Sequence, residues 1–162
     1  GEHPNHAWIA ANTNPDNVSG TLSDAMRGAD VFLGVSAPNI LTEADIESMA
    51  PDSVVFAMAN PVPEVDPDIA ARHAAVVATG RSDFANQINN VLVFPGVFRG
   101  LIDSGVSHVD MDVLLAAADA LADVVRDDER NATYIIPSVF HPDVSTVVAD
   151  AVGAAVAARE GA

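Results

Sequence analysis

Uncharged side-chain amides gather in one short stretch of the chain, between Gly80 and Gly96. They belong to Asn86, Gln87, Asn89 and Asn90. The stretch directly follows a strand-like apolar run, residues 75–79, and the carboxyl end of a strand is where an open α/β sheet presents its ligand-binding loops. A buried carboxamide is costly unless another group hydrogen-bonds to it. Several amides at one strand end therefore indicate a site that holds a polar ligand.

A further amide, that of Asn60, follows a second strand-like run, residues 54–58, and repeats this arrangement. We expect the two loops to face one crevice. The alternative is structural, because asparagine often caps helices or adopts left-handed turns. Residue type alone favours that structural role.

Three apolar runs predict the strands that carry these loops. They are residues 31–35, 54–58 and 75–79. The first run, Val31–Val35, is continuously apolar, which is typical of a strand buried on both faces. Because helix signals separate the three runs, the chain predicts right-handed βαβ units and a parallel sheet.

Capping residues mark the expected helices. We predict that Thr21 begins a helix through Met26, and that Thr42, with Asp45 three residues on, opens a helix that stops at Pro51. Further helices are expected at residues 69–73, from Asn86 or Phe94 to Asp103, at residues 111–125, and from Pro142 to about Arg159. Residues 1–20 carry little periodicity, and their structure stays open.

Four sequence motifs occur in a fixed order along the chain. They are Ala29–Pro38, Val55–Pro61 with Pro63 and Glu64, Ala78–Phe84, and Asn89–Asn90 followed by Phe94–Gly96. In order and spacing they resemble the NAD(P)-binding domain of malic enzymes, and the resemblance extends from about Thr21 to Ala158. It implies an oxidoreductase that oxidises and decarboxylates malate to pyruvate and CO2, with NAD or NADP as cofactor. It also favours the ligand-binding interpretation of the amides.

By this resemblance, Asn60 and Asn90 hydrogen-bond the carboxylate groups of malate and the nicotinamide end of the cofactor, with Asn89 as the neighbouring candidate. An amide donates to a carboxylate without adding charge, which leaves a metal ion to polarise the carbonyl. Gly34 and Ser36 lie where a Rossmann domain lines its cofactor path. We expect Gly34 to permit close approach of the dinucleotide and Ser36 to donate a hydrogen bond to it. A buried tight turn explains Gly34 equally well.

Several parts of a complete site are missing. No G-x-G-x-x-G fingerprint occurs, so we predict an α/β fold with an incomplete Rossmann-like parallel sheet and flanking helices, whose first glycine-rich βα unit is absent. The resemblance places the general base lysine, the general acid tyrosine and the ligands of Mg or Mn upstream. The chain has no lysine, and its single tyrosine, Tyr134, is predicted to have a packing role. We therefore expect no catalytic residue and no metal ligand here, and a partial NAD(P)-binding domain, residues 1–162, that is inactive alone.

Two other functions stay open as alternatives. One is a non-catalytic Rossmann-like module for binding or assembly. The other is a different dehydrogenase with a similar second half, which the combination of Asn89–Asn90 with Phe94–Gly96 disfavours. For a malic enzyme, the implied partners are malate or pyruvate, the remainder of the polypeptide, and further copies in a homo-oligomer.

The charge of the chain is strongly negative, with 23 acidic residues against 7 basic ones, a net charge of −16, and no cysteine. Such a surface repels nucleic acid and anionic membranes. Molar salt would relieve the self-repulsion by shortening the screening length to about 3 Å, so we predict a halophilic, salt-adapted cytoplasm; an ordinary acidic protein is the alternative. No apolar run approaches the roughly 20 residues that a bilayer requires, and no signal-like N-terminus is visible. We therefore expect a cytoplasmic protein without a membrane or nucleic-acid partner.

Two local patterns complete the predictions. Gly96 and Gly100 are spaced for close helix packing rather than for a membrane segment, because Arg99 and Asp103 surround them. Arg81 is predicted to form an ion pair with Asp83 that supports the loop of Asn89 and Asn90.

Overall fold

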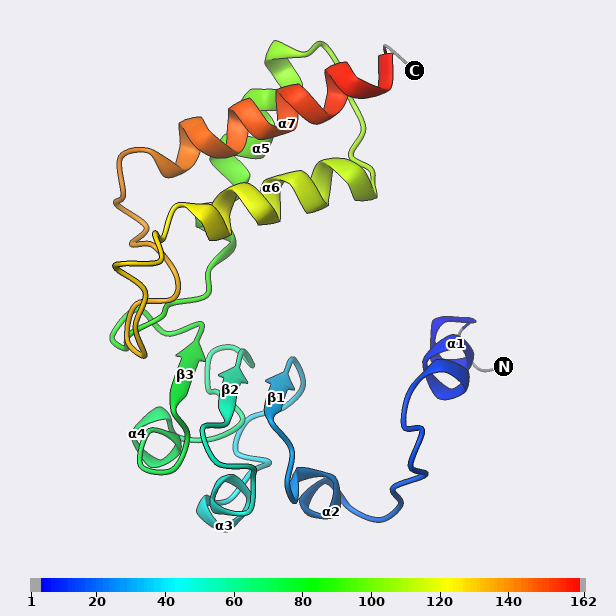
Figure 1. Ribbon diagram of the computed structural model, residues 1–162, viewed down its shortest axis with the longest axis vertical. Helices are drawn as coiled ribbons and strands as arrows, with labels where there is room; N and C mark the ends of the chain where they lie inside the picture. Colours follow the sequence, from blue (N-terminus) through cyan, green and yellow to red (C-terminus); the bar gives the residue numbers. More distant parts are fainter. Residues whose placement is uncertain (1–3, 161–162) are drawn as a thin grey trace.

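Three short parallel strands form the sheet of this protein, in a computed structural model that describes residues 4–160 (Figure 1). They are β1 Val31–Gly34, β2 Val54–Ala57 and β3 Val76–Thr79, in the spatial order β1-β2-β3. Gly34 pairs with Ala57, and Ala57 pairs with Thr79, so the carboxyl ends of the strands are level. The predicted parallel sheet with flanking helices is confirmed.

Three short helices pack against this sheet. They are α2 Leu22–Met26, α3 Glu43–Glu47 and α4 Pro67–Ala70, drawn below the strands in Figure 1. Their buried side chains, among them Met26, Ile46 and Ala70, form one core with Val55 and Ala57 of β2. We call this part of the chain the sheet half.

The predicted helix starts are confirmed by reciprocal caps. The hydroxyl group of Thr21 accepts the N–H of Asp24, whose carboxylate accepts the N–H of Thr21 in return, and Thr42 and Asp45 form the same pair. These caps satisfy N–H groups that the first turn of a helix leaves without a partner.

The end of α3 lies earlier than predicted. The helix stops at Glu47 and not at Pro51, because the next backbone groups bond elsewhere. Ser48 accepts the N–H of Gly28 at 2.8 Å, and the N–H of Ala50 donates to Ala29 at 3.0 Å. The chain after α3 is thus joined to the segment that leads into β1.

One face of β1 is uncovered. Val31 and Leu33 are 55% and 61% exposed, while Phe32 packs against the core of the sheet half. The prediction of a strand buried on both faces is therefore wrong for β1, since the helices that pack on the sheet leave the side chains of Val31 and Leu33 open.

An additional helix, α1 Pro4–Asn12, lies in the segment whose structure the sequence left open. All its residues are exposed, and Figure 1 shows it apart from the sheet and from the other helices. With no buried face, α1 leaves no periodic apolar pattern in the sequence.

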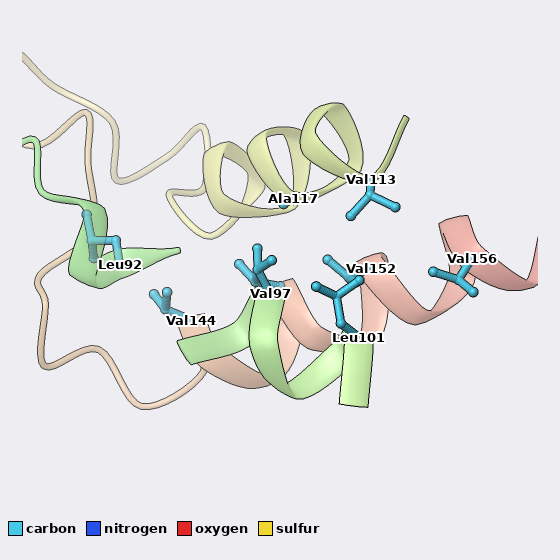
Figure 2. Close-up of a cluster of buried hydrophobic side chains, with 9 residues drawn as sticks. Leu92, Val97, Leu101, Val113, Ala117, Val144, Val152 and Val156 are labelled. Atoms are coloured by element: carbon cyan, nitrogen blue, oxygen red, sulfur yellow. The ribbon is translucent and has the colours of Figure 1, made fainter. Parts of the chain in front are cut away.

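A second core lies beyond the carboxyl ends of the strands and is built from helices alone. It contains the 3-10 helix η1 Asn90–Leu92 and the helices α5 Phe94–Asp103, α6 Met111–Asp123 and α7 Val144–Glu160. Figure 2 shows Val97 and Leu101 of α5 directed towards Val113 of α6 and Val152 of α7. We call this part the helical half. Of the two predicted starts for α5, Asn86 and Phe94, the helix begins at Phe94. The predicted start at Met111 is confirmed, and α7 begins two residues after Pro142.

Two glycines allow α5 to lie close against α7. A Cβ atom on Gly96 would lie 2.6 Å from Cβ of Val148, and one on Gly100 would lie 2.6 Å from the carbonyl oxygen of Ala149 and 2.7 Å from Cβ of Val152. The predicted role of this pair in close helix packing is confirmed.

We expect Gly100→Ala to lower the free energy of unfolding by about 1–3 kcal/mol, because the new methyl group would overlap the backbone of α7. Gly153→Ala is the matched control, since a Cβ there would meet only Oγ of Ser104 at 3.7 Å. In a helix interior, alanine is favoured over glycine by about 0.5–1 kcal/mol, so this control should raise stability. Urea unfolding followed by circular dichroism measures both, and equal stabilities for the two variants would contradict the packing assignment.

Asp110 joins the start of α6 to the end of α7. Its Oδ1 accepts the N–H of Val113 at 3.1 Å, and its Oδ2 lies 2.5 Å from Nη1 of Arg159. The pKa of the Asp110 carboxyl is lowered from its ordinary value, first by the Val113 N–H and further by the charge of Arg159, although burial opposes the shift. The ionised form is thus stabilised by folding.

A carboxyl group whose pKa is lowered by folding stabilises the protein above its unfolded pKa, about 3.9, and loses that contribution as pH falls through the folded pKa. We expect Asp110→Asn, which keeps a good helix cap, to lose less stability than the parent between pH 5 and pH 3. Asp119→Asn controls for removing one exposed charge from the same helix. Urea midpoints across this pH range test the prediction, which parallel curves for the parent and Asp110→Asn would contradict.

Candidate functional site

A cavity of about 350 Å³ lies at the carboxyl ends of the strands. It is lined by Val35, Met58, Asn60, Gly80, Ile88, Asn89 and Asn90. Each strand contributes, because Val35 follows β1, Met58 follows β2 and Gly80 follows β3. The expected crevice between the two amide-bearing loops is therefore present, and the structure brings Asn60, Asn89 and Asn90 together in it.

A second cavity, of about 210 Å³, adjoins the first. It shares Asn60 and Gly80 with the first cavity and is otherwise lined by Ala59, Pro61, Arg81, Ser82, Asp83 and Gln87. The side chain of Asn60 therefore borders both spaces, whereas Asn90 borders only the first of these two.

Asn86 has a structural role and lines neither of these two cavities. Only 6% of its surface is exposed, and its φ of 53° is left-handed. Its Nδ2 donates to the carbonyl groups of Val77 at 3.0 Å and Ala132 at 2.9 Å, and its Oδ1 accepts the N–H of Ile135 at 2.9 Å. The structural interpretation of an asparagine in a turn is thus correct for Asn86.

The amides of the cavity differ in how far they are already engaged. Oδ1 of Asn89 accepts the N–H of Val91 at 3.0 Å and so caps η1. Asn60 and Asn90 are exposed, and their side chains make no hydrogen bond with any residue from 4 to 160. An amide offers two N–H donors and one acceptor oxygen, so Asn60 and Asn90 are the two side chains best able to bind a ligand here.

A buried carboxylate that the sequence analysis did not assign lies beneath these loops. Glu64 has no exposed surface; its Oε1 accepts the N–H of Ser36 at 2.9 Å, and its Oε2 accepts the N–H of Ala59 at 3.0 Å. Its place in the second motif, four residues after Asn60, was the only signal in the sequence.

Gly34 leaves the space that this carboxylate fills. A Cβ atom on Gly34 would lie 2.5 Å from Cδ of Glu64 and 2.6 Å from Cε1 of Phe32. Gly34 is buried at the end of β1 and not in a tight turn, and the packing of Glu64 and Phe32 against it explains why it has no side chain. The side chain of Ser36 is exposed, and cofactor contacts by Gly34 and Ser36 stay predictions.

The predicted ion pair at the edge of the second cavity is confirmed. Nε and Nη2 of Arg81 donate to the two carboxylate oxygens of Asp83 at 2.9 Å and 2.5 Å. The guanidinium group also stacks 4.7 Å from the ring centre of Phe84. The hydrogen bonds from Arg81 lower the pKa of Asp83. Both charged groups are exposed, and their support of the amide loop stays a prediction.

Other chemistry is sparse in the described part of the chain. Among residues 4–160, no three His, Cys, Asp or Glu side chains lie close enough together to hold a metal ion. Tyr134 is half-buried, and its backbone N–H donates to the carbonyl group of Asn131. Within the same residues, no helix is both long and apolar enough to cross a membrane.

A parallel sheet with level strand ends, helices that pack on it, and neutral polar side chains in a cavity at those ends define a Rossmann-like, nucleotide-binding class of α/β domain. The family model described as "Malic enzyme, NAD binding domain" matches residues 6–157. The chain belongs to this family of malic enzyme NAD-binding domains.

Proteins similar in sequence to this chain are named malic enzymes. The chain is 56% identical over 151 residues to the NAD-dependent malic enzyme of Geobacillus stearothermophilus, covering 93% of this chain and 32% of that protein. It is 38% identical to the NADP-dependent malic enzyme of Escherichia coli, covering 96% of this chain and 23% of that protein. The crystal structure of a malic enzyme from Pyrococcus horikoshii superposes with a TM-score of 0.86 at 40% identity, covering 98% of this chain and 36% of that one. The chain thus spans about a third or less of these relatives.

We expect alanine substitutions of Asn86, Asn60 and Asn90 to differ in their effect on the free energy of unfolding. Asn86→Ala should lower the free energy of unfolding by about 2–4 kcal/mol, because it leaves buried backbone groups without partners. Asn60→Ala and Asn90→Ala should change it by less than about 0.5 kcal/mol, because these side chains are exposed and form no hydrogen bond within the described part of the chain. Urea unfolding of the three variants measures the difference. A large loss for Asn60→Ala or Asn90→Ala would contradict the assignment of these two amides to a ligand.

Proposed function

We propose that this chain forms part of an oxidoreductase that oxidatively decarboxylates malate to pyruvate and CO2 while NAD or NADP is reduced. The observation that carries the proposal is that the unengaged amides of Asn60 and Asn90 line one cavity at the strand ends. The family to which the chain belongs and the names of its relatives support this activity.

The lining of the cavity fits the ligands of such a reaction. Val35, Met58 and Ile88 provide apolar walls, against which a nicotinamide ring can pack. Asn60 and Asn90 offer N–H donors to malate carboxylates and an acceptor oxygen to the cofactor carboxamide, with Asn89 as the neighbouring donor. Because these groups are neutral, they can orient a dicarboxylate without adding charge to the site.

The remaining contacts lie along the cofactor path and outside this chain. We assign Gly34 and Ser36 to that path. A bound Mg or Mn ion would polarise the carbonyl group that malate oxidation forms before decarboxylation. We place the ligands of this metal ion in the remainder of the polypeptide. The chain has no lysine to act as the general base of the family, so we propose that it is inactive by itself.

The open side of β1 supports a place for further polypeptide. Within residues 4–160, β2 is the only strand that pairs with β1, and Val31, Leu33 and Val35 are 55%, 61% and 73% exposed. An exposed apolar edge strand is a template for pairing with additional chain. We propose that the remainder of the malic enzyme polypeptide covers this side, within a homo-oligomer.

We further propose that the protein works in a salt-rich cytoplasm. A net charge of −16 favours water and counter-ions over self-association, and molar salt shortens the range of repulsion to about 3 Å. The ion pairs of the described residues lie at the surface, such as Arg99 with Asp103, and add little stability of their own.

A hybrid enzyme tests the proposal. This chain replaces the matching 151-residue segment of the Geobacillus stearothermophilus malic enzyme, to which it is 56% identical. We expect malate-dependent NADH or NADPH formation that requires Mg or Mn. Asn90→Ala in the hybrid should lower kcat/KM by about 100-fold or more, because a misplaced substrate reacts far more slowly.

Asn12→Ala, which changes an exposed amide of α1, is the control and should leave turnover unchanged. A hybrid that folds but does not oxidise malate would count against the function. Normal turnover by Asn90→Ala would count against the assigned site.

A further inference from the structure

Glu64 is a fully buried acidic group that the proposed reaction does not use. It lies next to the cavity without lining it. Its two oxygens accept the N–H groups of Ser36 and Ala59 at 2.9 Å and 3.0 Å. Ser36 directly follows Val35, and Ala59 directly precedes Asn60, and both of these neighbours line the cavity. One carboxylate thus holds the backbone beside two cavity residues.

The position of this carboxylate is itself fixed by the backbone. The carbonyl group of Glu64 accepts the N–H of Leu41 at 3.0 Å, and that of Pro63 accepts the N–H of Asn39 at 3.0 Å. Gly34 leaves the room that the carboxylate occupies. An apolar side chain could fill the same space, but it could not accept two N–H groups, so the site uses the hydrogen-bonding capacity of Glu64 as well as its bulk.

We propose that Glu64 is a positioning residue for the malate site, which sets the place of Asn60 in the cavity by holding the N–H of Ala59 while it anchors the β1 loop through Ser36. This rests on the proposed function of Asn60. Glutamine at position 64 would offer one acceptor oxygen and one N–H₂ group, so one of the two backbone N–H groups would face a donor and shift.

The test uses the hybrid enzyme described above. We expect Glu64→Gln to raise KM for malate by about tenfold or more, since displacement of a substrate-binding group by even 1 Å weakens catalysis by up to about 100-fold. The enzyme is assayed at saturating cofactor, and the folded fraction is measured by circular dichroism. A loss of folded protein alone lowers the amount of active enzyme and leaves KM unchanged.

Asp45→Asn is the matched control. Asp45 is also a buried carboxylate that accepts a backbone N–H, that of Thr42 at 2.7 Å, but neither Thr42 nor its neighbours in the chain line the cavity. This control should lower the unfolding midpoint and keep KM for malate within about twofold of the parent, as a purely structural role predicts.

If Glu64→Gln does not fold, Glu64→Asp is assayed by the same criterion, because its carboxylate is one methylene too short to reach both N–H groups. A KM for malate within twofold of the parent in the folded variant would overturn the positioning role while the active parent hybrid upholds the function. An inactive parent hybrid would overturn both.

Discussion

The cavity depends on one interaction, in which a carboxylate with no exposed surface accepts backbone N–H groups from two strand ends. A buried charge is tolerated only when donors satisfy it, so the loops after β1 and β2 cannot separate without leaving Glu64 unsatisfied. Gly34 belongs to the same interaction, because any side chain there would displace the carboxylate. The loops that follow β1 and β2 are thereby held in one position relative to each other.

Asn86 also holds distant segments of the chain together through hydrogen bonds to their backbone. It joins the end of β3 to the segment at residues 132–135, which lies 46 to 49 residues further along the chain. That segment leads towards α7, so one amide links the sheet half to the helical half. Within residues 4–160 the sheet half and the helical half each have their own hydrophobic core.

Local signals in the sequence predicted the strands, the helix caps at Thr21 and Thr42, and a face of α5 suited to close packing, because each leaves its pattern in neighbouring residues. Contacts between distant residues were not predictable in the same way. Asn86 and Asn90 share a residue type and lie four residues apart, and it is the approach of the distant Ala132 and Ile135 that gives Asn86 its structural role. The bridge from Glu64 to Ser36 spans 28 residues and leaves no spacing pattern. The helix α1 was not predicted, because none of its residues is buried and its sequence has no periodic apolar pattern.

The uncovered side of β1 affects how the isolated polypeptide behaves in solution. Within residues 4–160 the outer backbone groups of β1 have no strand partner, and the side chains of Val31 and Leu33 are exposed. We expect such an apolar edge to pair with that of a second molecule and so to extend the sheet. Dimers or larger particles of the separate chain would then arise from this edge, favoured by salt that masks the mutual repulsion of acidic surfaces. The number of chains in such particles would then reflect pairing through the exposed edge of β1 and would not report how the proposed intact enzyme assembles.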